Sequence, residues 1–227
     1  MPRKNWQRAT GDDEKAIRSQ KILDSALKLF EKHPDVLPSV TEIAKASGLA
    51  KGTVYLYFET KEEIFLALLS RKYAQWTHLM SEALSKAREE RDERARLRQF
   101  RDAVAGYCIS NETFLRLACR SQSILEQNLT PDVALKFKTA LAAQVQAVGE
   151  GAERAFPKLA AKPGAGAKML LGTYALIVGF WQISDVPKGL AHLQTVDGLA
   201  HLFPDFKAEI GHSLEAYWIG YLNSLSS

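Results

Sequence analysis

The stretch Ser39 to Lys61, SVTEIAKASGLAKGTVYLYFETK, decides the fold of this chain. Apolar residues recur in it at helical spacing on both sides of a glycine: Ile43, Ala44, Leu49, Val54, Tyr55 and Phe58. Each half is too short for more than two or three helical turns, and the glycine between the halves breaks the periodicity. The pattern predicts two short helices joined by a sharp turn, which is a helix-turn-helix.

The ends of the first of these helices are marked by side chains. Ser39 is a good N-cap, and Glu42 stands three residues later, where its carboxylate reaches back to the Ser39 N–H in a capping box. Gly48 follows the helix, and glycine adopts the left-handed conformation of a helix end without steric cost. The chain is therefore expected to turn at Gly48 and to enter the second helix within a few residues.

The second helix carries groups suited to DNA. A cation, hydroxyls, aromatic edges and a position for close backbone approach lie at its start and along its outer face: Lys51, Gly52, Thr53, Tyr55 and Tyr57. Such groups bind phosphates and base edges in the major groove. The sequence therefore predicts a DNA-binding surface on this helix.

The run from about Ile22 to Leu69, ILDSALKLF and then VTEIAKASGLAKGTVYLYFETKEEIFLALL, resembles the DNA-binding domain of the tetracycline-repressor (TetR) family of bacterial transcriptional regulators. The distinctive part is the glycine turn followed by KGTVYLYF and by a lysine three residues after Phe58. One departure is the pair His33-Pro34, which stands where the first helix of the family commonly ends in glycine.

The resemblance assigns roles by position in the motif. It implies that Lys51, Gly52, Thr53, Tyr55 and Tyr57 face the major groove or its flanking phosphates, with Lys51 as the reader of guanine. It implies that Lys61 reaches a phosphate and that Thr41 does so from the preceding helix. Tyr57 and Lys61 would hold the DNA backbone, while Gly48 is structural.

Composition and charge agree with a protein of a reducing cytosol that meets a polyanion. The 227 residues carry a formal net charge of +4, and two cysteines are too few for a disulfide framework. The first fifteen residues lack the apolar core of a signal peptide. The most apolar run, Met169 to Ile183, is shorter than a membrane span and contains two glycines. We therefore expect a cytoplasmic location, no membrane segment and no cofactor.

The remaining periodicity predicts an all-α chain of about nine helices, with no strand-like segment. Residues 1–60 are expected to form an N-terminal arm and the three-helix DNA-binding domain, and residues 61–227 a helical ligand-binding and dimerisation domain. The expected helices cover about residues 14–32, 39–47, 51–58, 61–86, 92–110, 112–127, 131–155, 167–184 and 205–225. Pro187 to Pro204 is predicted to be a loop.

Two charged segments allow two interpretations each. Met1 to Asp13 reads as a loose arm, which either touches DNA or is a solvated tail. Lys86 to Arg101, KAREERDERARLRQFR, mixes both signs at helical spacing. Alternating signs favour a solvated face or a helix junction over a basic DNA-binding patch.

The last two long helices carry complementary stripes. Small residues form one stripe and large apolar residues the other: Gly172, Ala175 and Gly179, then Ile210, Leu214, Tyr217 and Tyr221. Small stripes let helices approach closely. The stripes either close the core of one subunit or pair with a second copy, and the family resemblance favours a homodimer with a four-helix interface.

The middle helices are rich in residues that either line an aromatic ligand pocket or simply form the core: Trp76, Phe100, Tyr107, Cys108, Phe114, Phe137 and Trp181. The resemblance implies a small apolar cavity among them. Cys108 and Cys119 are either oxidant sensors or small buried hydrophobes, and the second interpretation is favoured.

No catalytic motif occurs in the sequence, so the chain is not expected to be an enzyme. A metal site from His201, Asp205 and His212 is conceivable, but ordinary surface histidines explain these residues, and no metal is expected. The leading hypothesis is a ligand-responsive homodimeric repressor. It would bind a pseudo-palindromic double-stranded operator and be released by an unidentified small apolar or aromatic effector. The alternative is a helical protein-interaction module without specific DNA binding.

Overall fold

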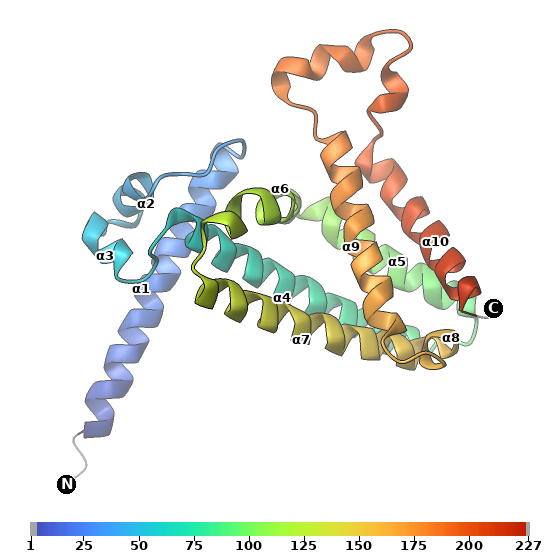
Figure 1. The fold of residues 1–227 in the computed structure, drawn as a ribbon, viewed down its shortest axis with the longest axis horizontal. Helices are drawn as coiled ribbons and strands as arrows, with labels where there is room; N and C mark the ends of the chain where they lie inside the picture. Colours follow the sequence, from blue (N-terminus) through green and yellow to red (C-terminus); the bar gives the residue numbers. More distant parts are fainter. Residues whose placement is uncertain (1–3, 226–227) are drawn as a thin grey trace. The chain divides into compact units, whose positions relative to one another are not determined.

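The computed structural model describes the backbone of residues 4–225 and the side chains of residues 13–225, apart from those of Gln122 and Lys188. Ten α-helices and four shorter helical segments make up this part of the chain, and it contains no strand (Figure 1). The predicted all-α class is confirmed. The helices divide into two compact units, one comprising residues up to Arg71 together with Arg120–Ala134, and the other comprising Lys72–Cys119 and Leu135 onward.

The first unit is built from α1 (Lys4–Lys32), α2 (Val40–Ser47), α3 (Lys51–Tyr55) and the first turns of α4 (Lys61–Ala87). Its core includes the fully buried Ile22, Phe30, Ile43, Val54 and Phe65. The rings of Phe30 and Phe65 pack with centroids 5.5 Å apart. The three-helix core predicted from the sequence is therefore completed by the beginning of α4.

The unit boundary differs from the expected division before residue 61. It falls within α4, after Arg71, because the first turns of this helix bury Ile64, Phe65, Leu68 and Leu69 in the first core. A second difference is the segment Arg120–Ala134, which groups with the first unit. The Arg120 guanidinium lies 5.7 Å from the centroid of the Phe30 ring and donates to the backbone oxygen of Asp35 at 3.4 Å.

The prediction of a loose N-terminal arm is wrong from Lys4 onward, because α1 begins there and runs without a break to Lys32. Residues 4–13 contain no proline, and Gln, Arg, Ala and Asp are compatible with helix, so Gly11 alone does not stop it. The first three residues lie outside the described part of the chain.

The second unit holds the rest of α4 and the remaining long helices. These are α5 (Glu93–Ser110), α6 (Glu112–Arg120), α7 (Pro131–Ala155), the short α8 (Pro157–Ala160), α9 (Ala165–Ser184) and α10 (Phe206–Ser224). The helices α9 and α10 run side by side, as Figure 1 shows. Phe100 of α5 stacks on Trp218 of α10 with ring centroids 4.8 Å apart, which joins these two helices in one core.

Two segments depart from the expected helix pattern. The helix predicted over 112–127 ends at Arg120 and continues as a π-helical turn, η1 (Ser121–Leu125), and a 3-10 turn, η2 (Glu126–Asn128). The predicted loop between α9 and α10 contains the 3-10 segments η3 (Lys188–Thr195) and η4 (Ala200–Leu202). Both segments form 3-10 or π-helical hydrogen bonds in place of α-helical ones, and the spacing of apolar residues does not predict this difference.

The mixed-charge run is a helix junction, as favoured from its charge pattern. The α4 helix ends at Ala87 and α5 begins at Glu93, with Asp92 accepting hydrogen bonds from the backbone of Arg94 and Ala95. Arg96 then donates to the backbone oxygens of Glu90 and Ala155 at 2.6 and 2.5 Å.

Among the described helices, none is by itself long and apolar enough to cross a membrane. The bent pair Ala165–Ser184 and Gly189–Thr195 meets the length and composition criteria only when its two parts are taken together.

Candidate nucleic-acid interface

The turn between α2 and α3 has the geometry that its sequence predicts. The Ser39 hydroxyl accepts from the Glu42 N–H at 3.2 Å, and the Glu42 carboxylate accepts from the Ser39 N–H at 2.8 Å, which forms the capping box. These bonds, with that from the Ser39 side chain first, lower the pKa of Glu42 below its ordinary value. Gly48 has φ 64°, and the Leu49 N–H donates to Ala44 O at 3.0 Å. The capped end and the left-handed glycine fix the start of α3.

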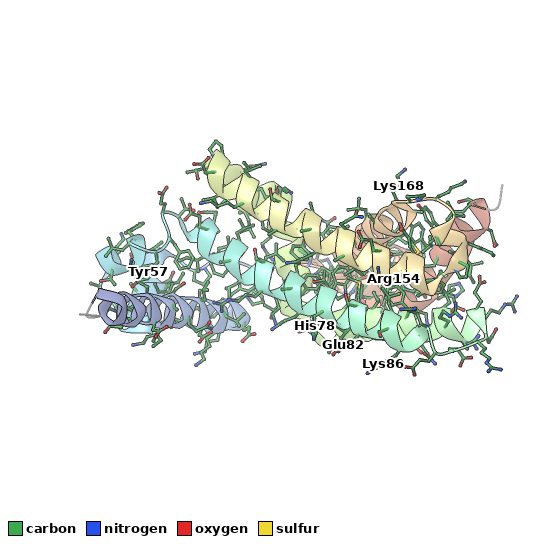
Figure 2. The ribbon with its side chains drawn as sticks, turned by 90° about the horizontal axis from the view of Figure 1, so that it is seen from below. Tyr57, His78, Glu82, Lys86, Arg154 and Lys168 are labelled. Carbon is green, nitrogen blue, oxygen red and sulfur yellow. The ribbon has the colours of Figure 1, made fainter. Side chains whose placement is uncertain are left out.

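The predicted DNA-binding residues lie on or beside the outer surface of this pair of helices. Thr41, Lys51, Gly52 and Tyr55 are exposed, whereas Thr53, Tyr57 and Lys61 are half-buried. Tyr57, labelled in Figure 2, follows α3, and its backbone N–H donates to Val54 O at 3.0 Å. Val54 itself is fully buried, so α3 presents one face to the core and the other to solvent.

Two of these side chains pair along the helix surface. The Lys51 ammonium lies 5.9 Å from the centroid of the Tyr55 ring, one helical turn further on. Exposed cation–π contacts of this kind are worth about 0.5–1 kcal/mol. Both side chains remain exposed in this contact.

Lys61 is also held only weakly. Its ammonium lies 3.9 Å from the Glu62 carboxylate, and 41% of the Lys61 side chain is exposed. Such surface pairs contribute about 0–1 kcal/mol, so exchange of Glu62 for a phosphate costs little.

The backbone conformation requires glycine at position 48 but not at position 52. Gly48 has a positive φ, while Gly52 lies in the helix α3 without one. A Cβ placed on Gly52 would meet no atom of the chain within 4 Å. A glycine inside a helix costs about 0.5–1 kcal/mol relative to alanine, and nothing within the subunit explains this one.

Two exposed residues of the same surface were not singled out from the sequence. Lys45 of α2 is exposed, and Leu56, directly after α3, is 83% exposed. Leu56 stands four residues after Gly52, so helical spacing alone would have placed it on the same side of the helix. A leucine in a helical pattern is ordinarily expected in the core, however, and the sequence therefore did not predict its exposure.

The residues predicted to line a ligand pocket do not form one group. Trp76, Tyr107, Phe114 and Phe137 contribute to an aromatic cluster that also includes Tyr73 and Tyr174. Phe100 packs on Trp218, and Trp181 packs on Phe206 at 5.3 Å. Cys108 is fully buried, and burial raises the pKa of its thiol to about 12.

The aromatic cluster has a polar interior. The hydroxyls of Tyr73 and Tyr174 are 2.7 Å apart, and the Tyr107 hydroxyl donates to Lys72 O at 3.1 Å. Burial raises the pKa of Tyr107 to about 12, so its hydroxyl stays protonated. The Trp76 Nε1 is buried without a hydrogen-bond partner among the described residues.

Trp181 lines a pocket of about 400 Å³ at the end of α9 where the chain returns into α10. The Arg116 guanidinium lies 5.6 Å from the Trp181 ring centroid and 2.7 Å from the Asp185 carboxylate. Phe203 and Phe206 form the other apolar walls, and the buried Ser184 hydroxyl has no partner among the described residues. Charged side chains line the pocket as well, among them Glu112, Asp205 and Lys207.

The residues predicted to form a dimer interface divide between core and surface. Ile210 and Leu214 are fully buried inside the subunit, so they form its own core and are not surface contacts. A Cβ at Gly172 would overlap the Tyr217 hydroxyl, and the Tyr221 hydroxyl donates to Ala165 O at 3.1 Å. These contacts join α9 and α10 of one subunit.

Small and apolar residues remain exposed on both helices of this pair. Ala175 and Gly179 of α9 are exposed, and so are Leu171, Ile183, Ala216, Ile219 and Gly220. Leu171 is 58% exposed and Ile219 42% exposed. We call these seven residues the α9–α10 face.

The histidines provide no metal site. No group of three or more His, Cys, Asp or Glu able to hold a metal ion occurs among the residues whose side chains are described. Asp205 caps α10 by accepting from the Lys207 N–H at 2.8 Å. His78 lies on the outer side of α4, 3.5 Å from Glu82, and Figure 2 shows both on one side of that helix with Lys86.

The capped α2, the left-handed glycine and the exposed polar face of α3 define a helix-turn-helix DNA-binding protein. Residues 22–68 match the family described as bacterial regulatory proteins, tetR family, and residues 70–224 match the tetracyclin repressor-like C-terminal domain. The chain belongs to the TetR family of transcriptional regulators.

Individual relatives resemble the chain mainly in the DNA-binding region. The fatty acid metabolism regulator protein of Bacillus subtilis is 35% identical over 69 residues, which are 30% of this chain and 36% of that protein. The regulator EthR of Mycobacterium tuberculosis is 41% identical over 64 residues, 28% of each chain. This chain therefore spans only about a third of the length of these relatives.

A solved structure extends the likeness of fold to nearly the whole chain. A TetR-family transcriptional regulator from Syntrophomonas wolfei superimposes with a TM-score of 0.58 and 18% identity, covering 94% of this chain and 97% of that one. At this identity the likeness concerns the fold alone.

Proposed function

We propose that this TetR-family regulator is a cytoplasmic homodimeric repressor that binds a pseudo-palindromic DNA operator through α3 and releases it when a small molecule binds. The observation that carries the DNA-binding surface is Gly52, an exposed helical glycine that no contact within the subunit explains. It lies beside the cation of Lys51 on the outer face of α3. A DNA backbone or base edge close to this glycine accounts for both features.

Lys51 and Lys61 have different roles in this proposal. Lys51 is exposed on α3 itself and is placed to read a guanine edge, whereas Lys61 at the start of α4 binds a phosphate. Thr41 of α2, Thr53, Tyr55 and Tyr57 complete the contacts. Phosphate contacts position a protein on any sequence, while base contacts select one.

A dimer supplies the second reading helix. One helix in one major groove offers too few contacts for an operator, whereas two helices about 34 Å apart reach successive turns on one side of the duplex. The α9–α10 face supports this proposal because apolar and small residues remain exposed there after the subunit core is complete. Burial of such a face is the main driving force of association.

The effector is proposed to be a small molecule with an aromatic or apolar part. Two places in the second unit support this: the pocket of about 400 Å³ beside Trp181 and the unpartnered Trp76 Nε1 in the aromatic cluster. The helix that carries Trp76 begins at Lys61. An effector that prefers one arrangement of α4 shifts the population of DNA-binding states by at most its differential affinity.

The test uses the full chain and an operator selected by it from a randomised duplex pool. Lys51→Ala is expected to weaken operator binding and to relax base preference. Lys61→Ala is expected to weaken binding to all sequences and to reduce the slope of log affinity against log salt by about one. Lys136→Ala, which removes an exposed lysine from α7, is the matched control and leaves both quantities unchanged.

Two outcomes would overturn the proposal. Unchanged operator affinity in both Lys51→Ala and Lys61→Ala would remove α3 and the start of α4 from the interface. Absence of salt-dependent DNA binding by the unmodified protein would favour the alternative, a helical protein-interaction module.

A further inference from the structure

Leu56 is the most exposed large apolar residue among those whose side chains are described, with 83% of its surface accessible. Its backbone is ordered into the helix end, with φ −72° and ψ −15°, and its N–H donates to Thr53 O at 3.2 Å. The side chain therefore projects from a defined position and not from a frayed end. The contacts of α3 with its own unit do not cover it.

The surroundings of Leu56 are polar and open. Helical geometry places it over Gly52 and Thr53, four and three residues earlier, with Tyr55 and Lys51 on the adjacent side. The space beside Gly52 is empty, since an added Cβ there would meet nothing within 4 Å. Leu56 is thus an apolar projection next to the open space at Gly52.

A single exposed leucine elsewhere would need no explanation. Here it shares a surface with the groups proposed to enter the major groove of an operator. The floor of that groove is polar except for the C5 methyl group of thymine, which is the apolar feature that side chains recognise there. A branched aliphatic side chain makes no hydrogen bond to a base, but it buries a methyl group well.

We infer that Leu56 contacts the C5 methyl group of a thymine in each half of the operator, and that the open space beside Gly52 lets the base edge approach this contact. This inference rests on the proposed operator binding and adds one specificity determinant to it. Leu56 selects thymine over cytosine and over any base without a methyl group at that position. Lys51 selects its own base independently.

The experiment removes the methyl group from the DNA and the leucine from the protein. In an operator selected by the full-length protein, each thymine is replaced in turn by deoxyuracil, which lacks only the C5 methyl group. Dissociation constants are measured by fluorescence anisotropy for the unmodified protein, for Leu56→Ala and for Leu135→Ala. Leu135 is the matched control, because this leucine of α7 is 66% exposed and lies in the second unit.

The expected result is a coupling at one thymine position of each half-site. There, loss of the methyl group weakens binding by the unmodified protein and by Leu135→Ala about fourfold, the equivalent of one buried methylene group. Leu56→Ala binds the thymine and deoxyuracil duplexes equally. Thermal unfolding of Leu56→Ala is unchanged, because the side chain contributes little to the fold.

The inference is overturned if no deoxyuracil replacement changes the dissociation constant of the unmodified protein. It is also overturned if every replacement weakens binding by Leu56→Ala as much as it weakens binding by the unmodified protein. The deoxyuracil series on the unmodified protein needs no variant, so a folding defect of Leu56→Ala would not obscure the first result. If the pool yields no enriched sequence, the proposed operator binding fails, and the inference about Leu56 fails with it. Operator binding without methyl dependence contradicts the role of Leu56 alone.

Discussion

The indole Nε1 of Trp218 donates a 2.7 Å hydrogen bond to the Thr173 hydroxyl, and both residues are fully buried. This bond joins α10 to α9. The Thr173 hydroxyl in turn donates to Met169 O at 2.8 Å, so all the polar atoms of this contact are satisfied. One hydroxyl in an apolar core thus contributes to the close packing of the two helices.

Thr173→Val is expected to lower the free energy of unfolding by about 1–3 kcal/mol, because it leaves the indole N–H buried and unpaired while preserving side-chain shape. Chemical denaturation with tryptophan fluorescence measures the change. Thr195→Val, an exposed threonine of η3, is the control and should have little effect. Equal stability of Thr173→Val and the unmodified protein would contradict this account of the helix contact.

Loss of the α2 cap is expected to destabilise the first unit. Ser39→Ala removes the N-cap hydroxyl and should cost about 0.5–2 kcal/mol. The lowered pKa of Glu42 adds a pH dependence. Its contribution is present above the ordinary value of 4.5 and is lost as the pH falls through the lower folded value.

Measurement of unfolding at several pH values between 3 and 7 would test this pH dependence. We expect the stability of Glu42→Gln to fall less steeply below about pH 4.5 than that of the unmodified protein. Parallel curves for the two proteins would show that the capping box does not contribute.

Gly52→Ala and Gly48→Ala are expected to have opposite effects on stability. Alanine at Gly52 meets no atom of the chain and should stabilise the helix by about 0.5–1 kcal/mol. Alanine at Gly48 must adopt a φ of 64°, which costs about 1–2 kcal/mol.

DNA binding separates the two glycines further. Gly52→Ala should lower operator affinity roughly tenfold, about 1.4 kcal/mol, although the protein is at least as stable as before. Thermal unfolding and anisotropy titration of the same samples give both quantities. A stabilised Gly52→Ala protein with full operator affinity would show that no DNA group approaches this glycine.

Placement of a charge on the α9–α10 face is expected to dissociate the proposed dimer. Ala216 is an exposed residue of this face, and Ala216→Arg would bury an unpaired guanidinium in the proposed apolar contact. Sedimentation should then report a monomer with reduced operator affinity. Ala143→Arg adds the same side chain to the exposed surface of α7, and this variant should still sediment as a dimer.

The two cysteines are expected to differ in reactivity. Cys108 is fully buried with a thiol pKa of about 12, so almost none of it is thiolate near neutral pH. Cys119 is partly exposed and its Sγ lies 3.8 Å from Val178 O. Mass spectrometry after brief alkylation at pH 8 should find label on Cys119 first, and prior labelling of Cys108 would contradict its role as a core residue.

Local signals accounted for most of the first unit. Ser39, Glu42 and Gly48 act through bonds to residues three to five positions away, so their roles could be predicted from spacing alone. The same holds for Thr60, whose hydroxyl accepts from the Glu63 N–H at 3.2 Å. The extra helical turns before residue 14 were missed because helix propensity there is moderate and no cap marks the start.

In the second unit, the sequence did not predict which aromatic residues pack together, because these contacts join residues far apart in the chain. Spacing does not distinguish Phe100, which stacks on Trp218, from Phe114, which packs on Trp76. Arg120, the last residue of α6, also contacts a residue distant in the sequence, since its guanidinium lies over the Phe30 ring.

The sequence by itself determined the all-α class, the helix-turn-helix and the family, because caps, glycine conformation and helical periodicity are local properties. Only the tertiary structure decided which apolar residues remain on the surface. It buried Ile210 and Leu214 within the subunit, left Ala216 and Ile219 exposed, and left Leu56 uncovered beside the open space at Gly52. Burial depends on which helices meet, and residues far apart in the sequence set that arrangement.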